Sequence, residues 1–359
     1  MKNQALFKIF SNIIILLCLG ITGLVGVAGY MSQKFYGNSY AYFLKHLVSI
    51  IVGLILGMAA YRLNFSLLKK KSGVIIAIAF ISMFLVFLPI IGGGAFGANR
   101  WIWLGFTSVQ PSEFFKLAAI VYCAFFLSEK RVKKWTESAA FLCLLAIFAL
   151  PIILQKDLST LIVLMSSLFV MYFLAETPRR HIIAISILAI VALSGLAVAE
   201  SYRLQRIKVL FNPDLDPMGA GYHLNQSLIT IGSGKLIGVG LGLSRQKFGF
   251  LPQAMTDTIF AIIAEEMGFL GALAIIGFII WLCFQIYELG KSTGEKFLRL
   301  ICFGAATWFM TQSFINISST VGLLPITGLP LPFISYGGSA IIAELAMCGI
   351  ILNISKKQI

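Results

Sequence analysis

Ten long apolar segments, separated by mostly short polar stretches, dominate the hydropathy pattern of this 359-residue chain. Crossing a membrane takes about 20 mainly apolar residues, and lipid offers an open backbone no hydrogen-bond partners, so each segment predicts a transmembrane helix. The predicted spans are residues 11–31, 44–61, 73–91, 111–128, 139–154, 160–176, 182–199, 257–287, 300–320 and 338–354. The first shows no small-residue cleavage site, which favours an uncleaved span over a signal peptide. The pattern predicts an all-α, polytopic integral membrane protein with a single membrane domain over residues 1–359.

One connection is much longer than the others and joins the seventh and eighth predicted spans. It covers residues 200–256 and is rich in Gly, Pro and charged residues. Loops longer than about 15 residues are usually functional or disordered. Because Tyr222, Leu224, Leu228 and Ile231 form an amphiphilic stretch, we expect an ordered loop that lies against the membrane.

Composition and charge agree with a membrane protein and give it an orientation. Hydrophobic residues make up 59% of the chain and charged residues 12%, about half the charge of a soluble domain. The net charge is +14, and most of the basic residues lie on alternate connections. These are Lys2, Lys8, Arg62, Lys69, Lys70, Lys71, Lys130, Arg131, Lys133, Lys134, Arg179, Arg180, Lys291, Lys296, Arg299, Lys356 and Lys357. The positive-inside rule places that side and both termini in the cytoplasm and leaves residues 200–256 outside. The same distribution argues against nucleic acid as a partner.

Cysteine and glycine patterns exclude several other sites. The six cysteines all lie in apolar segments without C-x-x-C spacing, so we expect buried thiols and no disulfide or zinc framework. Gly232-Ser233-Gly234-Lys235 lacks the flanking residues of a phosphate-binding loop, because Ile229 and Leu236 occupy the diagnostic positions. Gly92-Gly93-Gly94 is interpreted as a flexible loop.

Asp257 is the strongest candidate for chemistry, because it lies where the long polar loop meets the eighth predicted span. A carboxylate at the mouth of a membrane helix is costly to bury and usually functional. The alternative is a helix cap, a role that Asp favours. Glu265 and Glu266, about two turns further along, predict contacts inside the helix bundle. Glu344, within the tenth predicted span, has no account from the sequence.

Four segments on the predicted outer face carry a family resemblance. They are residues 99–105 with 110–117, residues 154–160, residues 240–247 with 251–257, and residues 322–328 with 331–339. Their order and spacing resemble the SEDS family of bacterial shape, elongation, division and sporulation proteins over nearly the whole chain. The pattern Gly-Leu-Gly-x-Ser-x-Gln-Lys at residues 240–247 is more similar to the FtsW and SpoVE types than to RodA.

The resemblance implies a peptidoglycan glycosyltransferase that polymerises lipid II on the outer face of the bacterial cytoplasmic membrane. It also implies a class B penicillin-binding protein as partner, with other divisome or elongasome membrane proteins. By match to the family, Asp257 is the general base. The candidates for substrate binding, of which the cationic side chains are expected to face outward, are Arg100, Glu113, Lys116, Arg206, Arg245, Lys247, Ser335 and Ser339. A divalent cation, Mg²⁺ or Mn²⁺, is expected, with Asp257 as a candidate ligand and no organic cofactor.

Several alternatives stay open at this point. Glu113 and Lys116 are three residues apart and could simply pair with each other. A lipid II flippase or a non-catalytic division scaffold would fit the same architecture, and the family's Glu-Ala-His before Thr-Asp is replaced here by Gln253-Ala254-Met255. The aromatic ninth span predicts a lipid-facing surface for the partner's membrane helix, formed by Phe303, Trp308, Phe309 and Phe314.

Overall fold

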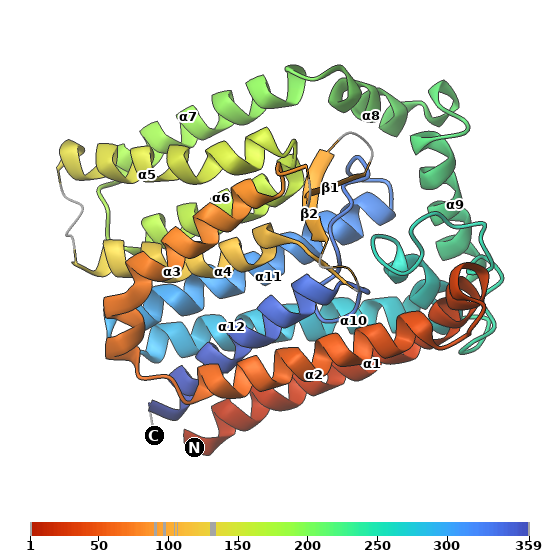
Figure 1. The fold of residues 1–359 in the computed structure, drawn as a ribbon, viewed down its shortest axis with the longest axis horizontal. Helices are drawn as coiled ribbons and strands as arrows, with labels where there is room; N and C mark the ends of the chain where they lie inside the picture. Colours follow the sequence, from red (N-terminus) through yellow and green to blue (C-terminus); the bar gives the residue numbers. More distant parts are fainter. Residues whose placement is uncertain are drawn as a thin grey trace.

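Ten long helices form the body of the protein and overlap the ten predicted spans (Figure 1). The first helix extends beyond its predicted span at both ends, and the third starts eight residues and ends six residues earlier than the predicted span 73–91. The computed structural model describes residues 2–89, 92–95, 98–103, 105, 107–129 and 134–357. The long helices are α1 (Lys2–Tyr36), α2 (Ala41–Tyr61), α3 (Phe65–Leu85), α4 (Pro111–Glu129), α5 (Trp135–Leu154), α6 (Leu158–Leu174), α7 (Arg179–Val198), α10 (Ile259–Ser292), α11 (Lys296–Thr320) and α12 (Gly338–Lys357). The predicted all-α, polytopic fold is confirmed.

Eight of these helices are long and apolar enough to cross a membrane. The other two are α3, whose first turns carry Lys69, Lys70 and Lys71, and α6, which has 17 residues. A 17-residue helix is about 26 Å long, at the short end of what spans a bilayer. The 21 residues of α3 are long enough to span a bilayer. We therefore assign both helices to the membrane-spanning bundle.

The loops predicted to share one side of the membrane do lie together. Both termini lie at the same end of the bundle in Figure 1. Three ion pairs connect loops assigned to the basic side: Lys69–Glu129 at 2.6 Å, Arg299–Glu176 at 3.2 Å and Lys357–Glu295 at 3.0 Å. Lys130, Arg131 and Lys133 lie outside the described residues, as do Leu104 and the last two residues of the third predicted span. The alternation of the loops is confirmed, and which side faces the cytoplasm stays a prediction.

The opposite end of the bundle carries the long connection between α7 and α10. It contains α8 (Ser201–Phe211), the short 3-10 helix η1 (Pro213–Leu215) and α9 (Ala220–Ser233), followed by irregular chain up to α10. The buried residues of α9 are Gly221, Leu224, Ser227 and Thr230, which are spaced by three and lie on one side of the helix, whereas Leu228 is exposed. The expectation of an ordered loop is confirmed.

A small antiparallel sheet at the same end was not predicted. Its strands are β1 (Gly92–Ala95), β2 (Ala98–Trp103) and β3 (Ser108–Val109), in the order β1-β2-β3. The interpretation of residues 92–94 as a flexible loop is wrong, because Gly93 pairs with Trp101 across the sheet. Branched and aromatic residues on the partner strand favour the extended conformation and outweigh the glycines.

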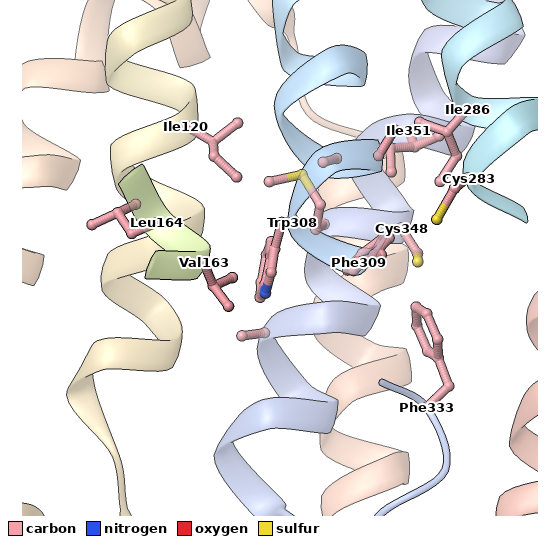
Figure 2. Packing of buried hydrophobic residues seen from close by; sticks show 14 of the residues in the cluster. Ile120, Val163, Leu164, Cys283, Ile286, Trp308, Phe309, Phe333, Cys348 and Ile351 are labelled. Atoms are coloured by element: carbon pink, nitrogen blue, oxygen red, sulfur yellow. The ribbon is translucent and has the colours of Figure 1, made fainter. Parts of the chain in front are cut away.

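The centre of the bundle is packed around α11. Figure 2 shows side chains of α4, α6, α10 and α12 meeting Trp308 and Phe309 of this helix. Trp308 is fully buried, Phe309 and Phe303 are at most 4% exposed, and Phe314 alone of the four predicted partner-facing aromatics is exposed. The predicted partner surface on the ninth span is therefore wrong for those three residues, because their bulk fills the protein core.

Glycines bring α2 and α12 into close contact. Gly57 lies four residues after Gly53 on one face of α2, and a side chain at Gly349 of α12 would collide with the backbone of Gly57. Such small-residue faces let membrane helices approach until their backbones touch. This contact fixes α12, and with it the segment before α12 that reaches the candidate site.

Candidate active site

Asp257 lies in the last residues of the long outer connection, two residues before α10 begins. Its N–H donates to the carbonyl oxygen of Gln253 at 3.2 Å. Its own carbonyl oxygen accepts from Asn316 Nδ2 at 2.8 Å and from Thr320 Oγ1 at 3.4 Å, both on α11. Two side chains of α11 therefore fix the backbone of Asp257, and these hydrogen bonds do not involve its carboxylate.

The carboxylate of Asp257 is partly buried, and its environment is unfavourable for a negative charge. Burial raises the pKa of Asp257 to about 6, although a hydrogen bond from Thr256 and the positive charges of Arg206 and Arg100 act in the opposite direction. The N-cap of α10 is Thr258, and no side chain caps this helix end. The capping alternative for Asp257 is therefore wrong in this structure.

Two arginines from separate elements contribute positive charge near this carboxylate. Arg100 of β2 donates to the carbonyl oxygen of Lys156 at 2.7 Å and lies 3.6 Å from a carboxylate oxygen of Asp157. Arg206 of α8 donates to the carbonyl oxygen of Ile326 at 2.8 Å. The sheet, α8, the α5–α6 turn and the α11–α12 connection thereby meet around Asp257. Both arginines act on the carboxylate of Asp257, and substrate binding by them stays a prediction.

A shallow hollow opens beside Arg206. Its lining is apolar apart from that guanidinium, with Leu210 from α8, Leu224 from α9 and Leu324 from the α11–α12 connection. The hollow is far smaller than a ligand pocket, so it marks where α8, α9 and the α11–α12 connection meet around the Arg206 guanidinium.

Lys116 and Glu113 do not face outward as expected. Both side chains are 1% exposed and form an ion pair at 3.0 Å on one face of α4. Lys116 Nζ also donates to Gln312 Oε1 at 2.7 Å and lies 4.8 Å from the ring centre of Trp308. The pairing alternative is confirmed, and binding of substrate by these two residues stays a prediction.

Lys247 is also enclosed, and its neighbour Arg245 is exposed. Lys247 pairs with Glu266 at 3.1 Å, and both side chains are at most 4% exposed. Ser244 Oγ bonds to the carboxylate of Glu265, which also accepts from the N–H of Arg245 at 3.2 Å. Glu265 and Glu266 are buried as expected, but their hydrogen-bond partners belong to the outer loop rather than to other helices of the bundle, so these two residues hold that loop against α10. The expectation that Lys247 faces outward is wrong, and substrate binding by Arg245 stays a prediction.

The two serines of the last motif act on the backbone. Ser335 Oγ donates to the carbonyl oxygen of Thr256 at 2.5 Å and accepts from the N–H of Leu331 at 2.8 Å. Ser339 Oγ accepts from the N–H of Gln110 at 2.9 Å. Both side chains are 4% exposed, so they fix the turns around the site, and their predicted contact with substrate stays a prediction.

A row of polar residues on α11 was not predicted from the sequence. Gln312, Asn316 and Thr320 are four residues apart and therefore lie on one face of the helix. Asn316 Nδ2 donates to the carbonyl oxygens of Asp257 and Leu329, the second at 2.6 Å. Polar side chains at this spacing in an apolar span were the signal that could have found them.

The donor set around Asp257 limits how a metal could bind. Over the ranges that the structure describes, no group of three or more His, Cys, Asp or Glu side chains could hold an ion. One partly exposed carboxylate fits a hard cation that takes most of its oxygen ligands from a phosphate substrate and water. It does not fit an ion held by the protein alone.

Fold and site together define a polytopic membrane protein with a carboxylate and two arginines at one end of its helix bundle. A family model described as cell cycle protein, of the FtsW, RodA and SpoVE type, matches residues 7–359. The chain belongs to this family, which confirms the resemblance found in its motifs.

Similar proteins are known from several bacteria. A probable peptidoglycan glycosyltransferase FtsW of Coxiella burnetii is 36% identical over 346 residues, covering 95% of this chain and 93% of the relative. An FtsW of the same description from Alcanivorax borkumensis is 36% identical over 346 residues, covering 93% and 90%.

Solved structures share the fold. A chain from a study of how a peptidoglycan synthase complex coordinates polymerization and crosslinking matches with a TM-score of 0.77 at 25% identity, covering 96% of this chain and 97% of that one. An Asp-to-Ala variant of the rod shape determining protein RodA from Thermus thermophilus matches with a TM-score of 0.70 at 25% identity, covering 97% and 96%.

Proposed function

We propose that this protein is a peptidoglycan glycosyltransferase that polymerises lipid II at the outer face of the bacterial cytoplasmic membrane. The observation that carries the proposal is the partly exposed carboxylate of Asp257, whose pKa of about 6 lies close to neutral pH. A general base is most effective when its pKa lies near the working pH. The FtsW relatives over nearly the full length of the chain support the same activity.

The proposed reaction joins the glycan parts of two lipid-linked substrates. Asp257 accepts the proton of the 4-hydroxyl group on the acceptor disaccharide. That oxygen forms a bond to the anomeric carbon of the donor glycan, and the bond from this carbon to the pyrophosphate oxygen breaks. The lipid pyrophosphate leaves with the electron pair. Arg100 and Arg206 stabilise the charge that develops on it, since their positive charges already act on this site.

A divalent cation, Mg²⁺ or Mn²⁺, is part of the proposal, with Asp257 as its protein ligand. When bound, such an ion would neutralise charge on the pyrophosphate. Asp257 would hold it through one carboxylate oxygen, and no organic cofactor is proposed.

We place both termini in the cytoplasm, and we propose a class B penicillin-binding protein as the partner that cross-links the product, with other divisome or elongasome membrane proteins. The match to a chain of a peptidoglycan synthase complex supports a partner of this kind. The exposed apolar side chains of α10, including Phe269, Trp281 and Phe284, offer a surface for a membrane helix.

The test is polymerisation of labelled lipid II by the purified protein together with its cognate penicillin-binding protein. Asp257→Asn keeps the size of the side chain but cannot accept the proton, so we expect the rate to fall about 10²–10⁴-fold. The matched control is Asp214→Asn, the same change at an exposed carboxylate of the same outer connection, which should leave the rate unchanged. Near-normal polymerisation by Asp257→Asn would exclude Asp257 as the base, whereas a lack of polymerisation by the unchanged protein would favour transport of lipid II or a scaffold role.

A further inference from the structure

Glu344 is a carboxylate buried inside a membrane-spanning helix, and the proposed reaction does not use it. Its side chain is 1% exposed on α12. Oε2 accepts from the N–H of Phe333 at 2.9 Å, and Oε1 accepts from Gln312 Nε2 at 3.4 Å. A carboxylate at this depth is costly and persists where its hydrogen bonds have a specific task. Its two partners indicate what that task is.

The first partner belongs to a turn with an unusual backbone. Phe333 has a φ of 63°, in the left-handed region that a bulky residue adopts only when its surroundings enforce it. Its side chain is 2% exposed, and its ring centre lies 5.1 Å from that of Phe309 in the core, where Figure 2 shows both residues. Among the described residues, Glu344 supplies the acceptor for the N–H of Phe333. This carboxylate therefore stabilises the turn by accepting the hydrogen bond from its strained residue Phe333.

The same turn forms hydrogen bonds to the segment that carries Asp257. Ser335 Oγ donates to the carbonyl oxygen of Thr256 at 2.5 Å, and the N–H of Tyr336 donates to that of Met255 at 2.8 Å. Residues 333–336 thus connect Glu344 to the two residues that precede Asp257. A shift of the turn would shift the general base.

The second partner connects Glu344 to α11. The amide group of Gln312 uses all its hydrogen-bonding positions: Oε1 accepts from Lys116 and Trp308, and Nε2 donates to Glu344 and to the carbonyl oxygen of Pro330. Pro330 starts the same turn. Glu344 therefore fixes the turn twice, directly at Phe333 and through Gln312 at Pro330.

We propose that Glu344 is a positioning residue. It holds the turn of residues 330–336 in place, and this turn keeps the carboxylate of Asp257 at the position where it can accept the proton of the substrate. The proposal rests on the proposed function. Glu344 acts through the turn, because its hydrogen bonds go to Phe333 and Gln312 and not to the reacting atoms. Displacing a catalytic group by about 1 Å can cost on the order of 100-fold in rate.

The test compares Glu344→Ala with Glu344→Gln in the lipid II polymerisation assay, using the full chain with its partner. Glu344→Ala should lower kcat about 10–100-fold, while KM for lipid II should change less than about 3-fold. Glu344→Gln keeps an oxygen for the N–H of Phe333 and should restore kcat to within about 5-fold of the unchanged protein. A raised KM with an unchanged kcat would overturn the proposal, because it would put Glu344 in contact with substrate.

The matched control is Asn353→Ala at the other end of the same helix. Asn353 Nδ2 donates to the carbonyl oxygens of Ala60 and Leu63, so this change also removes two buried hydrogen bonds from α12. It should lower thermal stability as Glu344→Ala does, but leave kcat of the folded protein unchanged. Equal losses of kcat in both variants would show a general stability effect and overturn the positioning role.

Hydrogen exchange separates this proposal from the activity itself. In Glu344→Ala, the amide protons of Phe333 and Tyr336 should exchange at least about 10-fold faster than in the unchanged protein. In Asn353→Ala, the exchange rates of the same two amide protons should not change. This readout does not depend on polymerisation. Unchanged exchange at both amides would overturn the positioning role even if the activity is confirmed. Faster exchange without polymerisation by the unchanged protein would support the link and contradict the proposed function alone.

Discussion

At the scale of the residue, the pKa of Asp257 sets a pH dependence for the proposed reaction. A general base acts in its deprotonated form, and burial raises the pKa of this carboxylate to about 6. We expect kcat/KM to be constant well above this pH and to fall about tenfold per pH unit below it. The measurement is a pH profile of lipid II polymerisation, with Asp214→Asn as a control for general effects of pH on the protein. A cation bound to Asp257 would lower this pKa and move the fall to lower pH, so the profile is taken at several concentrations of Mg²⁺. A profile that stays flat between about pH 5 and 7 at the lowest concentration that supports the reaction would contradict the assignment of the base.

Single residues also show where inference from sequence stops. Asp257 could be found because a carboxylate stands at the start of an apolar segment. The directions of Lys116 and Lys247 could not, because their carboxylate partners decide whether these side chains face water or the protein interior. Glu113 is three residues from Lys116, but Glu266 is 19 residues from Lys247 and meets it only through folding of the loop onto α10. Distant pairing of this kind leaves no local signal.

At the scale of the element, α10 is broken at Gly268, where φ is 71° and ψ is −171°. Segment 235–240 of the outer connection fills the break. Two of its N–H groups donate to the carbonyl oxygens of Glu265 and Glu266, and the first two N–H groups beyond the break donate back to it. The backbone groups freed by the break thus find partners, as they must in a membrane protein. The break anchors the connection that leads to Asp257.

This break predicts a sharp contrast between two glycines of the same helix. At Gly268 a side chain would be strained by the positive φ and would meet the backbone nitrogen of Gly238 at 2.3 Å. We expect Gly268→Ala to destabilise the protein by about 2–4 kcal/mol. Gly277 has open space around it, so Gly277→Ala should change stability by less than about 0.5 kcal/mol. Thermal unfolding in detergent measures both, and equal midpoints would contradict the role of the break.

Most helix boundaries could be predicted, and the features that were missed have different causes. Hydropathy located α4 (Pro111–Glu129) and α12 (Gly338–Lys357) to within a few residues, because a long apolar run is a local property. The sheet formed by β1 to β3 was missed although β1 and β2 are neighbours in the sequence, because a run of glycines has little strand propensity of its own. The break in α10 was missed because segment 235–240, which lies well before it in the sequence, supplies the hydrogen-bond partners for its backbone.

At the scale of the whole molecule, polarity is separated along the bundle. The arginines, the carboxylate and the hollow lie at the end that carries α8 and α9, and both termini lie at the other end (Figure 1). Large apolar side chains are exposed along α7 and α10, as expected where lipid replaces water. A site at one end of the bundle suits chemistry on a lipid-linked substrate at the membrane surface, whereas a transporter needs its site near the midplane.

The orientation of the bundle leads to the last prediction, which concerns the side on which the site lies. The basic loops place the site end outside the cell. Met218, in the long connection, is 91% exposed, and Lys70 at the opposite end is exposed as well. In a background without native cysteines, Met218→Cys should react with a membrane-impermeant maleimide in intact cells. Lys70→Cys should react only after lysis. Both should react in detergent solution, which controls for accessibility. Labelling of Lys70→Cys with protection of Met218→Cys in intact cells would invert the orientation and remove the site from the face where the proposed polymerisation takes place.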